Sequence, residues 1–244
     1  MQADLKTFAA RGVYGMSVVT AVTAQDTRAV RAIQAVSPRM VRAQIDAVLD
    51  DVGADAVKIG MLSGPAVVTV VADALARRRV GPIVVDPVMR ASAGTRLLRG
   101  EGWRLLRTRL LPLAAVVTPN LAEASALIGE PVGDVHEMCE AARRIRVLGA
   151  RAVVVTGGHL SGDAVDVLAV GRRVQLLRAQ RVPGSPVHGT GCTFAAALAA
   201  ELAKGGSVEA AARSAKRYTA ACIRRARALG AGQRVLGHLA YRPR

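Results

Sequence analysis

The sequence predicts an α/β protein with a doubly wound, mostly parallel sheet that helices cover on both faces. Short runs of consecutive apolar residues, rich in Val, alternate with longer helical segments along most of the 244 residues. Runs of this kind are typical of parallel strands whose two faces are both buried. Repeated strand–helix units of this length imply right-handed crossovers within one sheet.

The elements follow in a regular order. The chain opens directly with a predicted helix at residues 2–10, with no strand before it. Strands are expected at residues 17–23, 56–59, 83–85, 115–118 and 152–156. Helices are expected at residues 38–51, 64–78, 121–128 and 135–148, and Asp134 with Glu137 is a capping pair for the last of these. Residues 165–170 and 173–177 predict an antiparallel hairpin at the sheet edge, and helices at 190–203 and 207–229 close a single domain over residues 1–244.

The composition indicates a soluble protein that works on small molecules. The net charge is +16, but the basic residues are spread over nearly every polar segment, and six aromatic residues (two Phe, three Tyr, one Trp) offer little base stacking. Attraction of anionic nucleotides explains this charge more simply than a nucleic-acid partner. The longest apolar runs fall short of the about 20 residues that span a bilayer. Three cysteines at unrelated spacings indicate no disulfide framework, so we expect a cytoplasmic location without a membrane partner.

A glycine-rich segment, Gly189-Thr190-Gly191-Cys192, precedes one of the predicted helices. Backbone N–H groups at such a helix start can face an anion, and the helix dipole adds partial positive charge there. The same position favours the thiolate form of Cys192. The alternative is a glycine-rich turn in which Cys192 is a small buried hydrophobe. No Gly-Lys dipeptide occurs in the chain, which excludes a Walker loop.

Polar residues also follow three predicted strands. They form the segments Asp86-Pro87-Val88-Met89, Thr118-Pro119-Asn120-Leu121-Ala122-Glu123 and Thr156-Gly157-Gly158-His159. Taken singly, these segments fit an Asp-Pro turn, a helix cap and a turn with a surface histidine. Because the carboxyl ends of parallel strands meet at one sheet edge, they predict a shared ligand site. An anion cradle, metal ligands and a base are what phosphoryl transfer requires, so the set indicates a kinase.

Seven blocks of the sequence occur in the order found in a known family. They are Gln2-Ala3-Asp4-Leu5-Lys6-Thr7-Phe8, residues 20–27, Lys58-Ile59-Gly60-Met61-Leu62, residues 86–89, residues 118–124, residues 157–159 and residues 188–193. In these blocks the chain resembles the hydroxymethylpyrimidine/phosphomethylpyrimidine kinases of thiamin biosynthesis, which have a ribokinase-like fold. The resemblance implies ATP-dependent phosphorylation of 4-amino-5-hydroxymethyl-2-methylpyrimidine, and then of its monophosphate, to give the pyrophosphate.

The resemblance also assigns roles to residues. Substrate contacts would come from Gln25 at the aminopyrimidine edge, Asp4 at the hydroxymethyl side, and Met61 and Val88 against the ring. Mg²⁺–ATP would be organised by Asp86, Asn120 and Glu123, of which Asp86 and Glu123 are the candidate metal ligands, with Thr156 and Gly158 beside the nucleotide. The amides of Gly189, Thr190, Gly191 and Cys192 would form the anion hole, and Cys192 would take the proton of the substrate hydroxyl. Members of the family lack the lid domain of sugar kinases and form homodimers.

Two departures from the family pattern bear on this interpretation. The family carries a lysine where this chain has Thr156, which should weaken one phosphate contact unless nearby arginines substitute. The family also begins with a buried strand and an Asp-Pro-Ser-Gly-Gly-Ala-Gly loop, and this sequence begins just after the place where that loop ends. We therefore expect the true start codon to lie upstream of Met1, and the form read from Met1 to be N-terminally truncated, without one strand and part of the substrate pocket.

Three other functions fit parts of this pattern. A pyridoxal or pyridoxine kinase of the same superfamily would bind a similar methylated heterocycle with a hydroxymethyl group. A non-catalytic, truncated homologue would bind the pyrimidine without turning it over. A nucleic-acid binder would show an affinity for generic duplex that falls steeply with salt.

Overall fold

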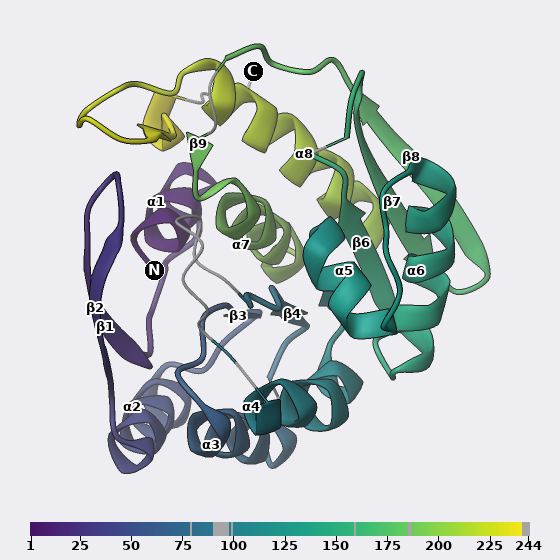
Figure 1. The fold of residues 1–244 in the computed structure, drawn as a ribbon. Helices are drawn as coiled ribbons and strands as arrows, with labels where there is room; N and C mark the ends of the chain where they lie inside the picture. Colours follow the sequence, from purple (N-terminus) through teal and green to yellow (C-terminus); the bar gives the residue numbers. More distant parts are fainter. Residues whose placement is uncertain (79, 90–97, 99, 159, 185–186, 241–244) are drawn as a thin grey trace.

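The centre of the molecule is a six-stranded sheet, seen in the computed structural model, which describes residues 1–78, 80–89, 98, 100–158, 160–184 and 187–240 (Figure 1). Its strands, in spatial order, are β3 (Val57–Ile59), β4 (Ile83–Val85), β5 (Val116–Val117), β6 (Ala152–Thr156), β7 (Ala164–Val170) and β8 (Arg173–Ala179). Neighbours from β3 to β6 pair in parallel, whereas β6–β7 and β7–β8 are antiparallel. The predicted mostly parallel sheet with an antiparallel hairpin at its edge is confirmed.

Helices cover both faces of this sheet. One face packs against α2 (Pro38–Asp51), α3 (Pro65–Ala76), α5 (Leu121–Ile128) and α6 (Val135–Val147), and the other against α7 (Thr190–Ala203) and α8 (Val208–Arg224). Successive residues of β4 alternate between the two cores, since Ile83 and Val85 contact the first and Val84 the second. This alternation is why the strands are apolar at consecutive positions. The predicted doubly wound arrangement is confirmed.

The first helix, α1 (Gln2–Ala10), begins and ends where the sequence predicts it, and it packs against α7.

Between β4 and β5 the described residues form three short helical pieces that the sequence analysis did not anticipate. They are α4 (Gly100–Leu105), a π-helical turn η1 (Leu106–Leu110) and a 3₁₀ turn η2 (Leu111–Leu113). Leu106, Leu110 and Leu111 are buried and hold this segment against α3.

The predicted strand at residues 17–23 is wrong in both position and partner. β1 (Ala21–Gln25) begins later and pairs antiparallel with β2 (Val30–Ala35), outside the six-stranded sheet. This ribbon stands to one side of α1 and α2 (Figure 1). Its turn is closed by the Asp26 carboxylate, which accepts hydrogen bonds from the backbone N–H groups of Arg28 and Ala29 at 2.8 and 2.9 Å. Most of its side chains are exposed, so it lacks the buried apolar run that marks a core strand.

The C-terminal segment differs from the prediction as well. Helix α8 ends at Arg224, and the following residues form β10 (Arg234–Val235), which pairs with β9 (Val187–His188), and the 3₁₀ turn η3 (His238–Ala240). The buried His238 ring nitrogen Nε2 lies 2.9 Å from Thr193 Oγ1 in the first turn of α7. The turn η3 is thereby fixed to the helix that carries the glycine-rich segment.

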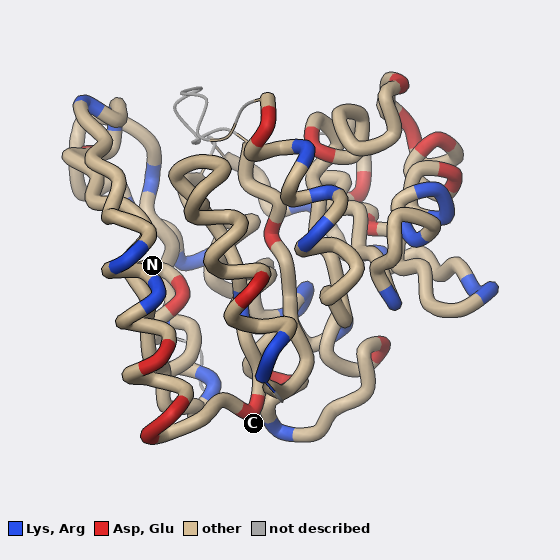
Figure 2. The backbone as a smooth tube through the Cα atoms, turned by 90° about the horizontal axis from the view of Figure 1, so that it is seen from below, with Lys and Arg blue, Asp and Glu red and all other residues tan. Residues whose placement is uncertain are grey.

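Lys and Arg residues are spread over helices, strands and loops among Asp and Glu, without forming one basic stripe (Figure 2). This distribution agrees with a small-molecule partner, because proteins that bind nucleic acid usually gather basic residues on one face. No helix within the described part of the chain is long and apolar enough to cross a bilayer.

Candidate active site

The carboxyl ends of four neighbouring strands lie along one edge of the sheet. The Asp86 N–H donates to Ile59 O at 2.8 Å, the Thr118 N–H to Val85 O at 3.0 Å, and the Thr156 N–H to Pro119 O at 2.9 Å. These bonds fix the residues after β3, β4, β5 and β6 in one row. The sequence-based expectation that the polar strand ends share an edge is therefore met.

A buried ion-pair cluster lies at the β3–β4 end of this row. The Lys58 Nζ is 3.1 Å from Asp4 Oδ1 and 3.6 Å from Asp86 Oδ2. The exposed fractions of these side chains are 5% for Lys58, 15% for Asp4 and 6% for Asp86. The sequence analysis placed Lys58 in a family motif but gave it no role. Its signal was a charged residue inside the otherwise apolar strand at 56–59, since a charge in such a position needs a partner.

The neighbours of Lys58 decide its ionisation. Burial opposes a charged ammonium, but Cys192, Asp86 and Asp4 together raise the pKa of Lys58 above its ordinary value. Burial also raises the pKa of Asp86, and the charge of Lys58 opposes that rise. Asp86 Oδ2 is buried and accepts no hydrogen bond among the described residues. The cluster thus consists of the Lys58 ammonium paired with the carboxylates of Asp4 and Asp86, and all three side chains are largely shielded from water.

The glycine-rich segment forms the N-terminus of α7, as predicted. Gly189 is the N-cap with φ +85°, a left-handed conformation that favours glycine, and no side chain caps the helix. A Cβ on Gly191 would meet no described atom within 4 Å, so the space beside it is open. The first amides of a helix have no partner within it, which leaves these groups suited to hold an anion.

Cys192 lies in the first turn of α7, and the charges of the ion-pair cluster change the pKa of its thiol. The charge of Lys58 lowers the pKa of Cys192, but burial together with Asp86 and Asp4 outweighs it and raises the pKa to about 12. The expected stabilisation of a thiolate by the helix start is therefore wrong for the protein without its ligands. The thiol also donates a hydrogen bond to Asp86. Burial, together with two carboxylates that lie far away in the sequence, causes this reversal.

The predicted cap of α5 is confirmed as a reciprocal capping box. Asn120 Oδ1 accepts from the Glu123 N–H at 3.0 Å, and Glu123 Oε2 accepts from the Asn120 N–H at 2.9 Å. The Glu123 carboxylate also accepts from the backbone of Met89. Burial, and next the charge of Asp86, raise the pKa of Glu123 to about 8. Glu123 thus joins the Asp86 loop to α5, and the two carboxyl groups are close enough to repel each other.

The turn after β6 is held from the inside by a second buried ion pair. The Gly157 N–H donates to Asp166 Oδ1 at 3.1 Å, and Asp166 Oδ2 lies 2.7 Å from Lys216 Nζ. A Cβ on Gly157 would come within 2.2 Å of Val165 O, so only glycine fits there. Thr156 lies beside Asn120 through a parallel bridge. His159, which the sequence analysis took for a turn or surface residue, is outside the described residues.

Arg181 holds the same turn from the outside. Its guanidinium donates to the carbonyl oxygens of Gly162 at 2.6 Å and Gly158 at 2.7 Å, and it also contacts that of Leu160. These carbonyls belong to the loop that joins β6 to β7, whereas Arg181 precedes β9 and the glycine-rich segment. The sequence analysis did not identify Arg181, because the acceptors are backbone atoms. Its guanidinium is engaged by this loop, so it does not stand free in place of the family lysine.

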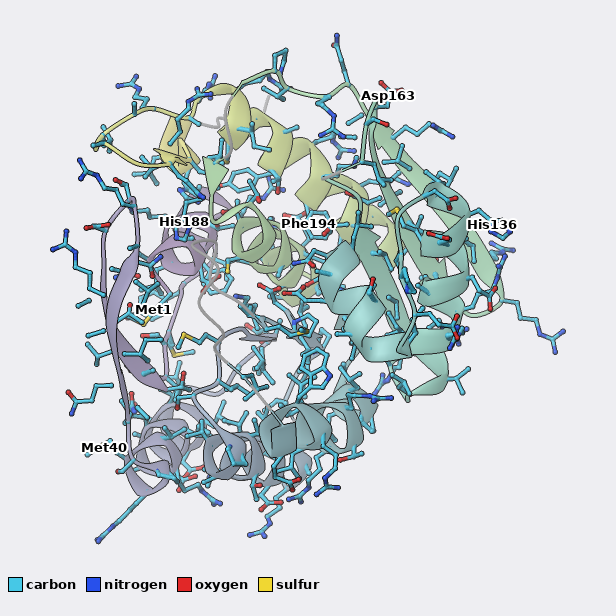
Figure 3. The ribbon with its side chains drawn as sticks, viewed as in Figure 1. Met1, Met40, His136, Asp163, His188 and Phe194 are labelled. Carbon is cyan, nitrogen blue, oxygen red and sulfur yellow. The ribbon has the colours of Figure 1, made fainter. Side chains whose placement is uncertain are left out.

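The residues predicted to contact the substrate ring come from the end of β1 and from the segments just after β3 and β4. Gln25 is exposed at the end of β1, and its Nε2 lies 3.4 Å from His188 Nε2. His188 lies in β9 beside α1, on the side of the molecule where the ribbon stands (Figure 3). Met61 and Val88 are half-buried just beyond β3 and β4. The ribbon is fixed near Met61, whose carbonyl oxygen accepts a hydrogen bond from Thr20 Oγ1 at 2.8 Å.

A divalent cation would fit this arrangement only together with a nucleotide. No group of three His, Cys, Asp or Glu side chains that could hold a metal by themselves occurs in the described part of the chain. Asp86 fits as a ligand, because its buried Oδ2 accepts no hydrogen bond from the described residues and has only the Lys58 ammonium nearby, at 3.6 Å. Glu123 fits less well, since its carboxylate already accepts backbone hydrogen bonds. Carboxylate and phosphate oxygens are the ligands that Mg²⁺ commonly takes in kinases.

Comparison with known proteins identifies relatives over nearly the whole chain. The family described as phosphomethylpyrimidine kinase matches residues 1–237. The hydroxymethylpyrimidine/phosphomethylpyrimidine kinase of Rhizobium meliloti is 50% identical over 236 residues, which cover 96% of this chain and 88% of that protein. The thiamine biosynthesis bifunctional protein of Geobacter sulfurreducens is 45% identical over 240 residues; the match covers 98% of this chain but only 49% of that longer protein.

Solved structures of two kinases have the same fold. The ADP complex of Bacillus subtilis pyridoxal kinase superimposes with a TM-score of 0.92 at 38% identity, covering 98% of this chain and 92% of that one. The phosphomethylpyrimidine kinase of Clostridium difficile superimposes with a TM-score of 0.79 at 38% identity, covering 89% of this chain and 90% of that one. Both likenesses confirm the predicted ribokinase-like fold.

Proposed function

Because the chain belongs to the phosphomethylpyrimidine kinase family, we propose that it phosphorylates 4-amino-5-hydroxymethyl-2-methylpyrimidine and then the resulting monophosphate, with ATP as donor. The observation that carries this proposal is the meeting of Asp86, Cys192 and the N-terminal amides of α7, which no described side chain caps, at one sheet edge. An acidic group, a proton acceptor and an anion cradle at one place are the parts that phosphoryl transfer needs.

The substrate would lie between the ribbon and the ends of β3 and β4. Gln25 would pair with the amino group and adjacent ring nitrogen, because an amide donates and accepts at once. Met61 and Val88 would pack against the ring, and Asp4 would hold the hydroxymethyl side. In this pose the hydroxyl oxygen would lie near Cys192.

In the first reaction the hydroxymethyl oxygen would attack the γ-phosphorus while the bond between that phosphorus and the β–γ bridging oxygen breaks, so that ADP leaves. The amides of Gly189, Thr190, Gly191 and Cys192 would hold the transferring phosphoryl oxygens. Cys192 would accept the hydroxyl proton as a thiolate. Since its pKa is raised to about 12 in the protein without ligands, the thiol would first have to release its own proton to solvent, before Mg²⁺–ATP engages Asp86.

We propose Mg²⁺ as the metal that accompanies ATP. Asp86 would bind it, and Glu123 with Asn120 would act mainly by fixing the Asp86 loop or through water. Bound with ATP, Mg²⁺ would neutralise charge that develops on the phosphate oxygens. Thr156 and Gly158 would face the nucleotide from the turn that Arg181 braces.

A pyridoxal or pyridoxine kinase is the second candidate. The likeness to Bacillus subtilis pyridoxal kinase, at a TM-score of 0.92, favours it. Identity to the pyrimidine kinase of Rhizobium meliloti, at 50%, favours the first candidate. A hydroxymethyl group on a methylated heteroaromatic ring is common to both substrates, so one protein could act on both.

We also propose a cytoplasmic homodimer. The ribbon supports the dimer, because Val22 and Ile33, on its opposite faces, are 60% and 39% exposed. A second copy that covers either face would remove apolar surface from water. Sedimentation of the purified chain at several concentrations tests the dimer, and monomers throughout would contradict it.

The proposed reaction is tested by product analysis. The protein is incubated with ATP, Mg²⁺ and the pyrimidine alcohol, and the products are followed by ³¹P NMR. We expect a monophosphate signal first and the coupled signals of a pyrophosphate later. ADP formation without phosphorylated pyrimidine, or no nucleotide turnover, would contradict the proposal.

A further inference from the structure

The Lys58 ammonium is the one group of the ion-pair cluster to which the proposed mechanism gives no task. It lies at the carboxyl end of β3 with its side chain only 5% exposed. Placing an ammonium in such a setting is costly unless it is paired. A charge kept there therefore needs a reason beyond packing, because replacing such a cluster as a whole by apolar side chains of similar volume is often neutral or stabilising.

The contacts of Lys58 join three elements that are far apart in the sequence. Asp4 belongs to α1 and Asp86 follows β4, and Cys192, on whose pKa Lys58 acts, lies in the first turn of α7. Lys58 Nζ is 3.1 Å from Asp4 Oδ1 and 3.6 Å from Asp86 Oδ2. The charge of Lys58 also acts on the Cys192 thiol. No other cation forms an ion pair with either carboxylate among the described residues, apart from the N-terminal ammonium of Met1 at Asp4.

The backbone beside Lys58 leaves room for this ammonium. A Cβ on Gly60 would lie 2.7 Å from Lys58 Nζ and 3.7 Å from its Cε, with no other atom within 4 Å. Gly60 does not have a left-handed backbone conformation, so an alanine there would meet no backbone strain. Within the described structure, the Lys58 ammonium is thus the one group with which the methyl group of an alanine at position 60 would clash.

We propose that Lys58 is a positioning residue that serves as the resident cation of the site and holds Asp4, Asp86 and Cys192 in their reactive arrangement. Without this cation, Asp4 and Asp86 would be two buried carboxylates with uncompensated charge. They would then separate or take up a cation from solution. In the intact site Lys58 occupies that place, which leaves Mg²⁺ to enter with the nucleotide. The activity readout of this inference rests on the proposed kinase function, but its binding and stability readouts do not.

The first test removes the charge. We expect Lys58→Met to lower kcat by about 10²-fold, as loss of a preorganised charge typically does, and to lower Tm by about 6–20 °C, as for other broken buried pairs in a domain of this size. In the absence of nucleotide, added Mn²⁺ should raise the Tm of this variant and not that of the unchanged protein. The matched control is Lys204→Met, which removes an exposed lysine paired with Glu201 at the far end of α7; it should leave kcat and Tm unchanged.

A second variant keeps the charge and moves it. We expect Gly60→Ala to lower kcat about tenfold with little change in Tm, because the displaced ammonium still compensates the carboxylates but no longer aligns them. This variant decides the matter if Lys58→Met does not fold. A kcat within about threefold of the unchanged protein for Gly60→Ala would then overturn the inference.

The double variant Lys58→Met/Asp4→Asn separates charge compensation from packing. Removing one carboxylate should restore part of the Tm that Lys58→Met loses, because the remaining charge no longer has a like neighbour. If Lys58 only filled space, the two losses would add. Additive losses, or a Lys58→Met variant whose Tm does not respond to Mn²⁺, would overturn the inference.

Discussion

The two sides of the site hold their functional groups by different means. On the β3–β4 side, the groups are side-chain charges, and Lys58 lies between Asp4 and Asp86. On the β5–β6 side, each charged side chain binds a backbone atom: Glu123 accepts from Asn120 N–H, and Arg181 donates to the carbonyls of the loop after β6. Asp166, which is also paired with Lys216, accepts from Gly157 N–H. Buried charges depend strongly on each partner, whereas a loop held by several bonds of about 1 kcal/mol each tolerates the loss of one. Substitutions should therefore affect turnover on the first side and nucleotide binding on the second.

The largest expected effect concerns Cys192 on the charged side. Replacing Cys192 by Ala should lower kcat by about 10²–10⁴-fold, the usual range for loss of a general base. The KM for ATP should change little, because the backbone amides of α7 remain. Steady-state kinetics measure both constants.

The control for this variant is Cys139→Ala, a partly buried cysteine of α6. It should leave kcat unchanged. If Cys192→Ala also kept full turnover, Cys192 would be a packing residue and the base would have to be sought elsewhere.

A smaller effect is expected from Arg181 on the backbone side. Arg181→Met removes the donors that hold the carbonyls of Gly158 and Gly162. Hydrogen bonds to a charged group are worth about 1.5–3 kcal/mol, and partial exposure reduces this, so we expect the KM for ATP to rise about tenfold. Turnover at saturating ATP should stay near that of the unchanged protein.

Arg173→Met is the matched control, because Arg173 is an exposed residue at the start of β8 and pairs with Val170, at the end of β7 that lies away from the loop. Its KM for ATP should not change. If Arg181→Met lowered kcat and left the KM for ATP unchanged, the prediction that this side of the site governs nucleotide binding would be wrong.

Gln25 should produce a still smaller effect, and only on the substrate. Gln25→Leu removes the exposed amide at the end of β1, and loss of neutral hydrogen bonds should raise the KM for the pyrimidine roughly 3–10-fold. The KM for ATP should be unchanged. Gln34→Leu, on the neighbouring strand of the ribbon, is the control for the added apolar surface. Equal changes in both KM values would indicate a folding defect instead of lost recognition.

A further effect concerns stability instead of turnover: the stability of the fold should depend on pH through Glu123. Its pKa is raised from the ordinary 4.5 to about 8, so between these values the folded state keeps a proton that the unfolded state releases. The stabilisation that Glu123 provides is therefore present below about pH 4.5 and is lost as the pH rises through 8. Urea unfolding at several pH values should show this decline.

Glu123→Gln should flatten the decline, because the amide cannot titrate and can still accept from the Asn120 N–H. Glu137→Gln is the matched control: Glu137 has the equivalent position in the first turn of α6 and is exposed. Parallel pH profiles for Glu123→Gln and the unchanged protein would show that Glu123 is not the group responsible.

The sequence was sufficient to predict the elements that a short local pattern of residues marks. Consecutive apolar residues such as Ile83–Val85 predicted the parallel strands, and Asn120 with Glu123 predicted the cap that the structure contains. The ribbon was missed because β2 is exposed at nearly every position and carries no apolar period. The helical pieces at 100–113 were missed although Trp103, Leu106, Leu110 and Leu113 recur at a helical spacing. Gly100, Gly102 and Pro112 in the same segment are more typical of turns.

The details of the site that escaped prediction are long-range. Lys58 meets Asp4 and Asp86 only after the chain has folded, and the raised pKa of Cys192 depends on the same contacts. Local reasoning from the helix dipole alone gave the opposite direction for that pKa. Arg181 binds carbonyl oxygens, and a sequence does not reveal which carbonyls a side chain will reach. Motifs therefore predicted which strand ends would meet at one sheet edge, but the electrostatics required the three-dimensional structure.

The central claim, a kinase for a hydroxymethylated aminopyrimidine, is tested most directly by substrate discrimination. The measurement is kcat/KM of the chain with ATP and Mg²⁺ for the pyrimidine alcohol and for pyridoxal, each alone and then in competition. We expect the pyrimidine to be preferred at least about tenfold, since one well-placed amide pair contributes about 1–2 kcal/mol of discrimination. Gln25→Leu should reduce this preference while the Gln34→Leu control keeps it. A preference for pyridoxal, or no phosphorylation of either substrate, would contradict the account.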